Sequence, residues 1–219
     1  MNDFFAKRVD GYDEHMLDEV LGCKEGYHLM AERIPKDAKR ILDLGCGTGL
    51  ELDEIFKVSP NLEVVGIDMC KEMLRVLTEK HQDKNLRLIC ADYLAEDFGK
   101  KNFDCVVSFE TMHHFLHNTK ASLYKKIRRA LRSGGIYIEC DYMAIDDKEE
   151  KKLLSQYETI RKKHGIKTEE LYHIDIPFSV SHQKELLKSA GFETVEEIFR
   201  LGGTVMLIAK QHRDGKKQT

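Results

Sequence analysis

Three glycines at alternate positions follow an apolar segment and an acid in this chain. Residues 41–50 read ILDLGCGTGL, so that Asp43 precedes Gly45, Gly47 and Gly49. Glycine has no Cβ and adopts positive φ easily, which lets backbone N–H groups approach a ligand more closely than other residues allow. The spacing therefore predicts a strand, then a ligand-binding turn, and then a helix that begins at the turn.

The spacing of these glycines also indicates which ligand the turn binds. A dinucleotide site has the pattern G-x-G-x-x-G, whereas here Leu50 stands at the last position and Gly49 comes one residue early. Asp43, together with Glu51 in the first turn of the helix, would repel a pyrophosphate. A ligand with an ammonium group would instead be attracted to Asp43. The pattern thus argues against NAD.

The pattern D-x-G-x-G-x-G after a first strand resembles the first motif of the class I S-adenosylmethionine (SAM) dependent methyltransferases. The resemblance covers residues 36–210. It implies a Rossmann-like methyltransferase fold, SAM as the cofactor and a small-molecule acceptor. It also implies that the turn binds the cofactor through Asp43, Gly45, Cys46, Gly47, Thr48 and Gly49.

Two further acids follow the second and third predicted strands. Asp68 lies about 20 residues beyond the glycine turn, where a carboxylate can accept both ribose hydroxyls. Asp92 resembles the acidic position of the family that accepts the adenine amino group, with Met69 and Tyr93 as apolar walls for the purine. Two alternatives stay open, because an acid at a strand end can cap the next helix and Tyr93 can be a core aromatic.

The loop after the fourth predicted strand reads SFETMHHFLH over residues 108–117. In the family this loop passes beneath the methionine part of the cofactor, so Ser108 and Phe109 are expected cofactor contacts. The pair His113 and His114 resembles a paired-histidine stretch of the family. His113 and His117 also have the spacing of two metal ligands on one helix face, but no third ligand is evident and we predict no metal.

Methyl transfer from a sulfonium is an in-line displacement for which the cofactor already carries the activated methyl group. Near-attack positioning contributes on the order of 7 to 11 kcal/mol, and a general base adds roughly two to four powers of ten in rate. A catalytic residue is therefore not required. If a base exists, we expect His113 or His114, because imidazole titrates near neutral pH. The alternative is that one of the pair packs inward against a backbone carbonyl.

Other candidate contacts come from the two segments outside the regular alternation. Tyr12, in the run RVDGYD, resembles an N-terminal tyrosine-aspartate element of small-molecule members in which the tyrosine closes over the cofactor. The alternative is a plain helix start with Asp13 as the N-cap. The expected acceptor contacts are Tyr142, Tyr172, His173 and Phe178.

Alternating strand and helix signals predict an α/β fold, a doubly wound, seven-stranded and mostly parallel sheet. Strands are expected near 40–44, 62–67, 86–90, 103–108, 135–141, 192–199 and 203–210, and helices near 49–58, 70–82, 118–132 and 181–190. Only residues 201–203 separate the last two strands, which is too short for a helical crossover, so this C-terminal pair is antiparallel.

One domain is expected over residues 1–210, followed by a flexible tail over 211–219. Residues 1–35 form an N-terminal helical cap, with helical periodicity from Asp13 to Arg33 and packing across the edge of the sheet. Residues 142–180 are a candidate lid, because an insertion at the carboxyl end of a parallel sheet lies where ligands bind. The alternative is a solvated helical excursion, with its helix ending at Gly165.

Composition limits the partners. The 219 residues include 35 Lys and Arg against 38 Asp and Glu, a net charge of -3, so no basic field favours nucleic acid. Six cysteines without a C-x-x-C pair, no apolar leader and no long apolar run indicate a reduced, cytoplasmic protein without a membrane span. A homodimer is allowed.

Three alternative functions stay open. A transfer-RNA or protein methyltransferase is the first, although the loop at residue 108 has neither the proline turn of base-amino methyltransferases nor a Pro-Cys nucleophile. A non-catalytic SAM-binding regulator would lack an acceptor cavity. A carboxy-SAM-forming relative binds a second small acid and would need a buried arginine near the sulfonium, which cannot be placed in this sequence.

Overall fold

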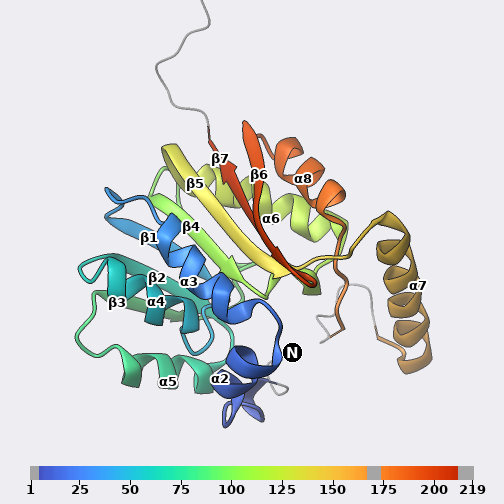
Figure 1. The fold of residues 1–219 in the computed structure, drawn as a ribbon, viewed down its shortest axis with the longest axis horizontal. Helices are drawn as coiled ribbons and strands as arrows, with labels where there is room; N and C mark the ends of the chain where they lie inside the picture. Colours follow the sequence, from blue (N-terminus) through green and yellow to red (C-terminus); the bar gives the residue numbers. More distant parts are fainter. Residues whose placement is uncertain (1–4, 167–173, 212–219) are drawn as a thin grey trace, which may run out of the picture.

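The computed structural model describes residues 5–166 and 174–211. Its centre is a seven-stranded sheet in the order β3-β2-β1-β4-β5-β7-β6, with helices on both faces (Figure 1). The neighbouring strands β3 to β5 pair in parallel, and β7 runs antiparallel to both β5 and β6. The doubly wound sheet with an antiparallel C-terminal pair is therefore confirmed. The strands are β1 (Arg40–Leu44), β2 (Glu63–Asp68), β3 (Leu86–Cys90), β4 (Phe103–Phe109), β5 (Leu131–Tyr142), β6 (Thr194–Leu201) and β7 (Thr204–Lys210).

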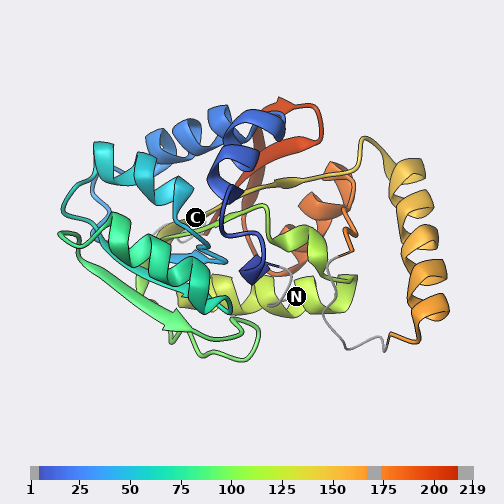
Figure 2. The same ribbon diagram turned by 90° about the horizontal axis from the view of Figure 1, so that it is seen from below.

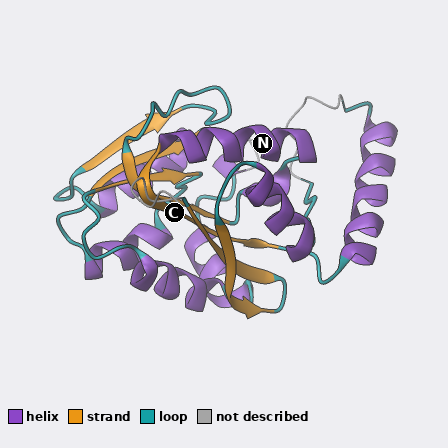
Figure 3. Cartoon of the chain, turned by 90° about the horizontal axis from the view of Figure 1, so that it is seen from above, coloured by secondary structure: helices purple, strands orange, loops and turns teal. Residues whose placement is uncertain are grey.

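The central strands are apolar along their length because both faces of the sheet are covered. On one face pack α3 (Cys23–Arg33) and α4 (Leu50–Val58), with α5 (Lys71–Lys80) against β2 and β3. On the other face pack α6 (His117–Ala130) and α8 (Val180–Ser189). Figure 2 shows the sheet between these two helical layers, and Figure 3 shows the same layers from the opposite side. The helices thus leave the carboxyl ends of the parallel strands open for a ligand.

The N-terminal region has the expected helical character, divided into α2 (Tyr12–Glu14), a π-helical turn (His15–Glu19) and α3, which begins after Gly22 at φ 90. Its position differs from the prediction. It covers a face of the sheet and not the edge, because α3 packs directly on β4 and β5. A Cβ on Gly26 would lie 2.9 Å from Phe109 Cζ, and the Tyr27 ring stacks on Phe109 at 3.8 Å.

The insertion after β5 forms α7 (Asp147–His164), which stands apart from the sheet (Figure 2). Asp146 caps its first turn by accepting from the backbone N–H groups of Lys148 and Glu149, and Gly165 ends it at φ 66, as predicted. Tyr157 is its one buried residue. None of the helices in the described part of the chain combines the length and apolar composition needed to cross a bilayer.

Candidate active site

A cavity lies at the carboxyl ends of β1, β2, β3 and β4, beside the glycine turn. The acids predicted at the strand ends face it together with the aromatic residues that follow them. Parallel strands end at one edge of a sheet, which is why residues far apart in sequence meet here. The predicted cofactor residues that line it are Tyr12, Gly45, Gly47, Asp68, Met69, Asp92, Tyr93 and Phe109.

Gly47 and Gly49 of the turn differ in how closely other atoms pack around them. Gly49, at φ 81, packs tightly, because a Cβ there would lie 2.3 Å from Leu77 Cδ1. Gly47, at φ 46, is open on its cavity side, since the nearest atoms to a Cβ would be 3.9 and 4.0 Å away. The turn thus keeps one glycine for close helix packing and leaves another free of side-chain bulk where a ligand approaches.

Asp68 is held in place by the turn it faces. Its Oδ2 accepts from the Gly47 backbone N–H at 3.0 Å, and its Oδ1 accepts from the Cys70 backbone N–H at 2.7 Å. Burial raises the pKa of this carboxyl, while the backbone donors oppose the rise. Asp92 is fixed in the same way, because its Oδ1 accepts from the Leu94 backbone N–H at 2.8 Å. Both carboxyls therefore have defined orientations at the cavity wall.

Five predicted cofactor residues do not line the cavity, and their contact with a cofactor stays a prediction. Ser108 is fully buried and its hydroxyl pairs with the Tyr137 hydroxyl at 2.7 Å. Thr48 donates to Asp13 Oδ1 at 2.6 Å. Asp43 is fully buried beneath the turn. The five are Asp43, Cys46, Thr48, Gly49 and Ser108.

Asp43 lies beside a second buried acid, Glu51. Burial raises the pKa of Asp43 to about 7, and burial together with the Asp43 charge raises the pKa of Glu51 well above its usual range. Two carboxylates cannot both ionise at low cost in one buried site, so the pair holds a proton near neutral pH.

This pair predicts that stability falls as pH rises. The folded chain keeps a proton on Asp43 and Glu51 at pH values where the unfolded chain has released it. The free energy of unfolding therefore decreases as the pH rises from 3.8, the ordinary pKa of Asp, through about 7, the pKa of Asp43 in the folded chain. Glu51→Gln removes one ionisable group and should flatten this dependence. We would measure melting temperatures between about pH 5 and pH 8 by circular dichroism. Glu79→Gln, on the exposed side of α5, is the control; an unchanged slope in Glu51→Gln would contradict the shared proton.

The N-terminal segment closes one side of the cavity. Gly11 occupies the N-cap position of α2, so Asp13 is not the cap. The Asp13 carboxylate accepts instead from Thr48 Oγ1 and, at 3.3 Å, from Lys80 Nζ. These contacts attach the segment to the glycine turn and place Tyr12 at the cavity wall. Burial raises the pKa of the Tyr12 phenol, which therefore stays protonated.

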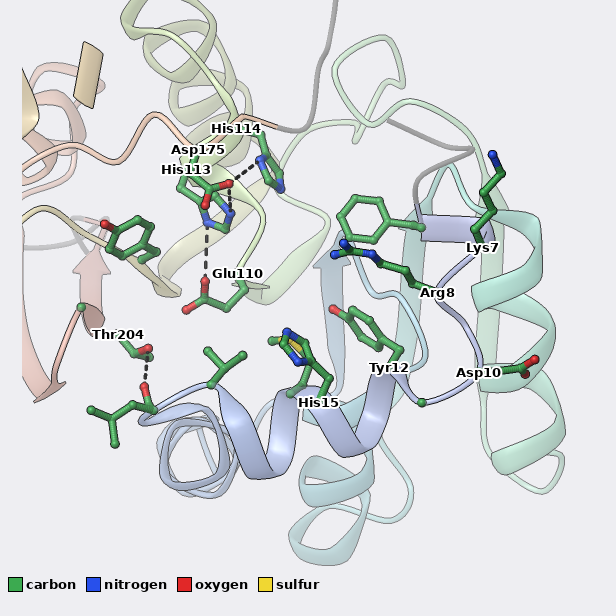
Figure 4. A pocket seen from close by; sticks show the side chains of 17 residues that line it. Lys7, Arg8, Asp10, Tyr12, His15, Glu110, His113, His114, Asp175 and Thr204 are labelled. Atoms are coloured by element: carbon green, nitrogen blue, oxygen red, sulfur yellow. Dashed lines mark hydrogen bonds and ion pairs between the residues drawn. The ribbon is translucent and has the colours of Figure 1, made fainter. Parts of the chain in front are cut away.

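A second cavity of about 770 Å³ adjoins the first (Figure 4). The N-terminal segment, the loop after β4, Tyr142 and the β6–β7 turn enclose it. Tyr142 is a predicted acceptor contact and lines this cavity, whereas Phe178 is buried and stacks on His182 at 4.4 Å. Tyr172 and His173 lie outside the described residues. The residues that line both cavities are Phe5, Tyr12, Glu110 and His114.

The described residues of α7 line neither cavity, so the lid stays a prediction. The insertion reaches the second cavity only through Tyr142 and Asp175 in the described residues. At its base, Asp147 and Glu150 bind Ser179, and Glu150 also pairs with His182. These contacts fix the start of α7 beside α8.

Charged side chains gather on one wall of the second cavity. His113 Nδ1 lies 2.5 Å from Asp141 Oδ1, and Glu110 Oε2 lies 3.6 Å from the same nitrogen. Asp175 Oδ1 lies 3.6 Å from His113 Nε2 and also 3.6 Å from His114 Nδ1. His113 packs inward as the alternative foresaw, but its partner is a carboxylate and not a backbone carbonyl.

The pKa values of His113 and Glu110 on this wall are both raised, but for different reasons. Burial lowers the pKa of His113, but Asp141, Glu110 and Asp175 outweigh it and raise the value to about 9. Burial raises the pKa of Glu110 to about 8. At neutral pH His113 is thus an imidazolium beside Asp141, and Glu110 is protonated.

Sequence reasoning gave Asp141 and Asp175 no role. Asp141 lies near the end of β5, so the rule that found Asp68 and Asp92 at strand ends would also have found it. Asp175 follows a long insertion and belongs to no pattern, and only the path of the chain brings it to the two histidines.

The sequence of this chain is similar to sequences of known proteins. Residues 41–135 match the model of a family described as "Methyltransferase domain". A carboxy-S-adenosyl-L-methionine synthase of Campylobacter fetus is 30% identical over 191 residues, which cover 83% of this chain and 80% of that protein. A protein of the same name from Campylobacter hominis is 28% identical over 221 residues, with 96% and 90% covered.

Solved structures share the fold. An O-methyltransferase family protein from Burkholderia thailandensis has a TM-score of 0.72 at 15% identity, with 96% of this chain and 62% of that chain covered. Human N-acetylserotonin methyltransferase in complex with SAM has a TM-score of 0.68 at 15% identity, with 97% and 57% covered. This chain therefore spans about 60% of the length of these two structures, and at such identity the likeness concerns the fold alone.

Proposed function

Because this chain belongs to the class I SAM-dependent methyltransferase family, we propose that it transfers the methyl group of SAM to a small acceptor in the 770 Å³ cavity. The observation that carries the proposal is the junction of the two cavities. Tyr12, Glu110 and His114 line both of them, so a ligand in one faces a ligand in the other. A SAM-binding regulator would not need this second space.

The residues of the first cavity fit SAM. In this proposal the oriented carboxylate of Asp68 accepts from the ribose diol and Asp92 accepts from the adenine amino group, with Met69 and Tyr93 as walls for the purine. When bound, SAM supplies an activated methyl group. The protein then has to orient the acceptor and exclude water, which is worth on the order of 7 to 11 kcal/mol.

Tyr12 and the paired histidines have proposed roles on the acceptor side. Tyr12, a neutral phenol that lines both cavities, would contact both the cofactor and the acceptor. His113 and His114 face the acceptor, as the sequence predicts for a residue that assists the reaction.

Carboxyl transfer to SAM is the second candidate, because the curated relatives carry the name carboxy-S-adenosyl-L-methionine synthase. Such a reaction uses a second small acid, for which we expect a buried arginine near the sulfonium. Among the described lining residues Arg8 is the one arginine; it is exposed and lies across the cavity from His113 and Asp175 (Figure 4). None of the described residues that line the cavity is a buried arginine, and on this ground we favour methyl transfer.

The test supplies SAM with a labelled methyl group and fractions of a metabolite extract, and identifies the products by mass. We expect S-adenosylhomocysteine and a labelled small molecule, with no product from Asp68→Ala. Carboxylated SAM without homocysteine product would favour the second candidate. Label found only in transfer RNA or protein would overturn the small-molecule assignment.

The cellular setting is also part of the proposal. We place the protein in the cytoplasm, acting without nucleic acid, and a homodimer is compatible with it. Six free cysteines and a net charge of -3 support this setting.

A further inference from the structure

Three side chains on the wall of the second cavity present ligand atoms to one point. They are His113, His114 and Asp175, and one ligand atom from each lies within 4.8 Å of those from the other two. Asp175 Oδ1 is close to both His113 Nε2 and His114 Nδ1. We propose that they bind a divalent transition-metal ion, and that the acceptor completes its coordination. This goes beyond the sequence analysis, which predicted no metal.

The spacing suits such an ion. Zinc binds imidazole nitrogen at about 2.0–2.1 Å and carboxylate oxygen at about 2.0–2.2 Å, so two ligands of a tetrahedral site lie roughly 3.4 Å apart. The distances from Asp175 Oδ1 to the two histidine nitrogens are both 3.6 Å. Two imidazoles and one carboxylate suit zinc or iron(II), and they leave coordination positions open for a substrate.

Asp141 prepares His113 for this role. The Nδ1–H of His113 donates to Asp141 Oδ1 at 2.5 Å, and the Tyr142 backbone N–H donates to the same oxygen at 2.8 Å. Asp141 is nearly fully buried, and its hydrogen bond orients the ring so that Nε2 is left to face the cavity. A carboxylate on the second ring nitrogen is the usual companion of a histidine that binds a metal.

A second grouping of Glu110, His113 and Asp141 also brings ligand types together. It is not the site, because 2.5 Å between His113 Nδ1 and Asp141 Oδ1 is too short for two ligands of one ion and is a hydrogen bond. Glu110 Oε1 is buried and has no hydrogen-bond partner among the described residues.

The position of the ion defines the class of acceptor, and this step rests on the proposed function. The open positions face the acceptor cavity, and His114 also lines the SAM cavity. An acceptor hydroxyl on the ion would lose its proton to solvent, since a bound cation lowers the pKa of an oxygen ligand. Its oxygen would bond to the methyl carbon as the carbon–sulfur bond breaks, with the electron pair staying on sulfur. We therefore infer an acceptor with a hydroxyl group.

The test uses the full chain after treatment with a chelator. Cobalt(II) is titrated and followed by its visible absorption, and zinc binding is measured by calorimetry. We expect one ion per chain, with affinity reduced about 10- to 100-fold or more in Asp175→Asn and in Asp141→Asn. His117→Ala should bind as the wild type does, because this exposed imidazole lies outside the cluster. SAM binding should be unchanged in Asp175→Asn, which lines only the acceptor cavity, and this shows that the variant is folded.

Failure of the two proposals can be told apart. A wild-type chain that binds neither ion, or an Asp175→Asn variant with undiminished affinity, would overturn the metal site whatever the enzyme does. Stoichiometric binding that depends on Asp175 supports the site even where no methylated product forms, in which case only the proposed function fails.

Discussion

Replacing Asp68 with alanine is expected to weaken SAM binding about 100- to 1000-fold. The carboxylate is oriented by the backbone N–H groups of Gly47 and Cys70 and faces the cavity, where it can accept two ribose hydroxyls. A hydrogen bond to a charged group is worth about 1.5–3 kcal/mol, so two of them account for a loss of this size. Isothermal calorimetry with SAM and S-adenosylhomocysteine would measure it.

Two comparisons show whether this loss comes from the ligand. Asp83→Ala removes an acid whose side chain is 76% exposed, outside both cavities, and should leave SAM affinity unchanged. Melting temperature reports any damage from the loss of the Gly47 and Cys70 hydrogen bonds. An Asp68→Ala variant that binds SAM as tightly as the wild type would remove the ribose role from this residue.

Gly47→Arg is expected to abolish SAM binding while the domain stays folded. A Cβ at Gly47 would meet no atom closer than 3.9 Å, so the backbone tolerates a side chain apart from the strain of φ 46, which costs about 1–2 kcal/mol. The rest of the arginine would occupy the cavity that SAM needs. Calorimetry should detect no binding, and circular dichroism should show a cooperative unfolding transition.

The chain offers a matched control for this substitution. Gly165 also has a positive φ, at 66, with nothing within 4 Å of a Cβ, and it ends α7 away from both cavities. Gly165→Arg therefore carries the same backbone strain and the same added charge without filling the site. Unchanged SAM affinity in both Gly47→Arg and Asp68→Ala would defeat the assignment of this cavity to SAM.

The sequence alone led to the glycine turn and to the acids at the strand ends. Gly45, Gly47, Asp68 and Asp92 all reach the first cavity. This succeeded because a parallel sheet places every strand end at one edge, so a residue's position along its strand is enough to locate it. The order of helices and strands was equally readable, since each element has its own hydrophobic period.

The direction in which a single side chain points was harder to predict from the sequence. Ser108 and Phe109 are neighbours on β4, yet Phe109 lines the cavity and Ser108 bonds to Tyr137 within the sheet. Successive residues of a strand point to opposite faces, and only the twist and cover of the whole sheet determine which face meets the ligand. Asp43 illustrates the same limit, because the packing of α4 buries it beside Glu51.

What the sequence by itself determined is thus the fold and which strand-end residues meet at one cavity, since both depend on local spacing along strands and turns. The wall formed by His113, His114, Asp141 and Asp175 was decided only by tertiary structure. Asp141, on β5, bonds to His113 in the loop after β4. Asp175 comes after the whole of α7 in the sequence, yet it lies beside the two histidines. Contacts between residues so distant in sequence depend on how the layers pack, because no local pattern relates one side chain to the other.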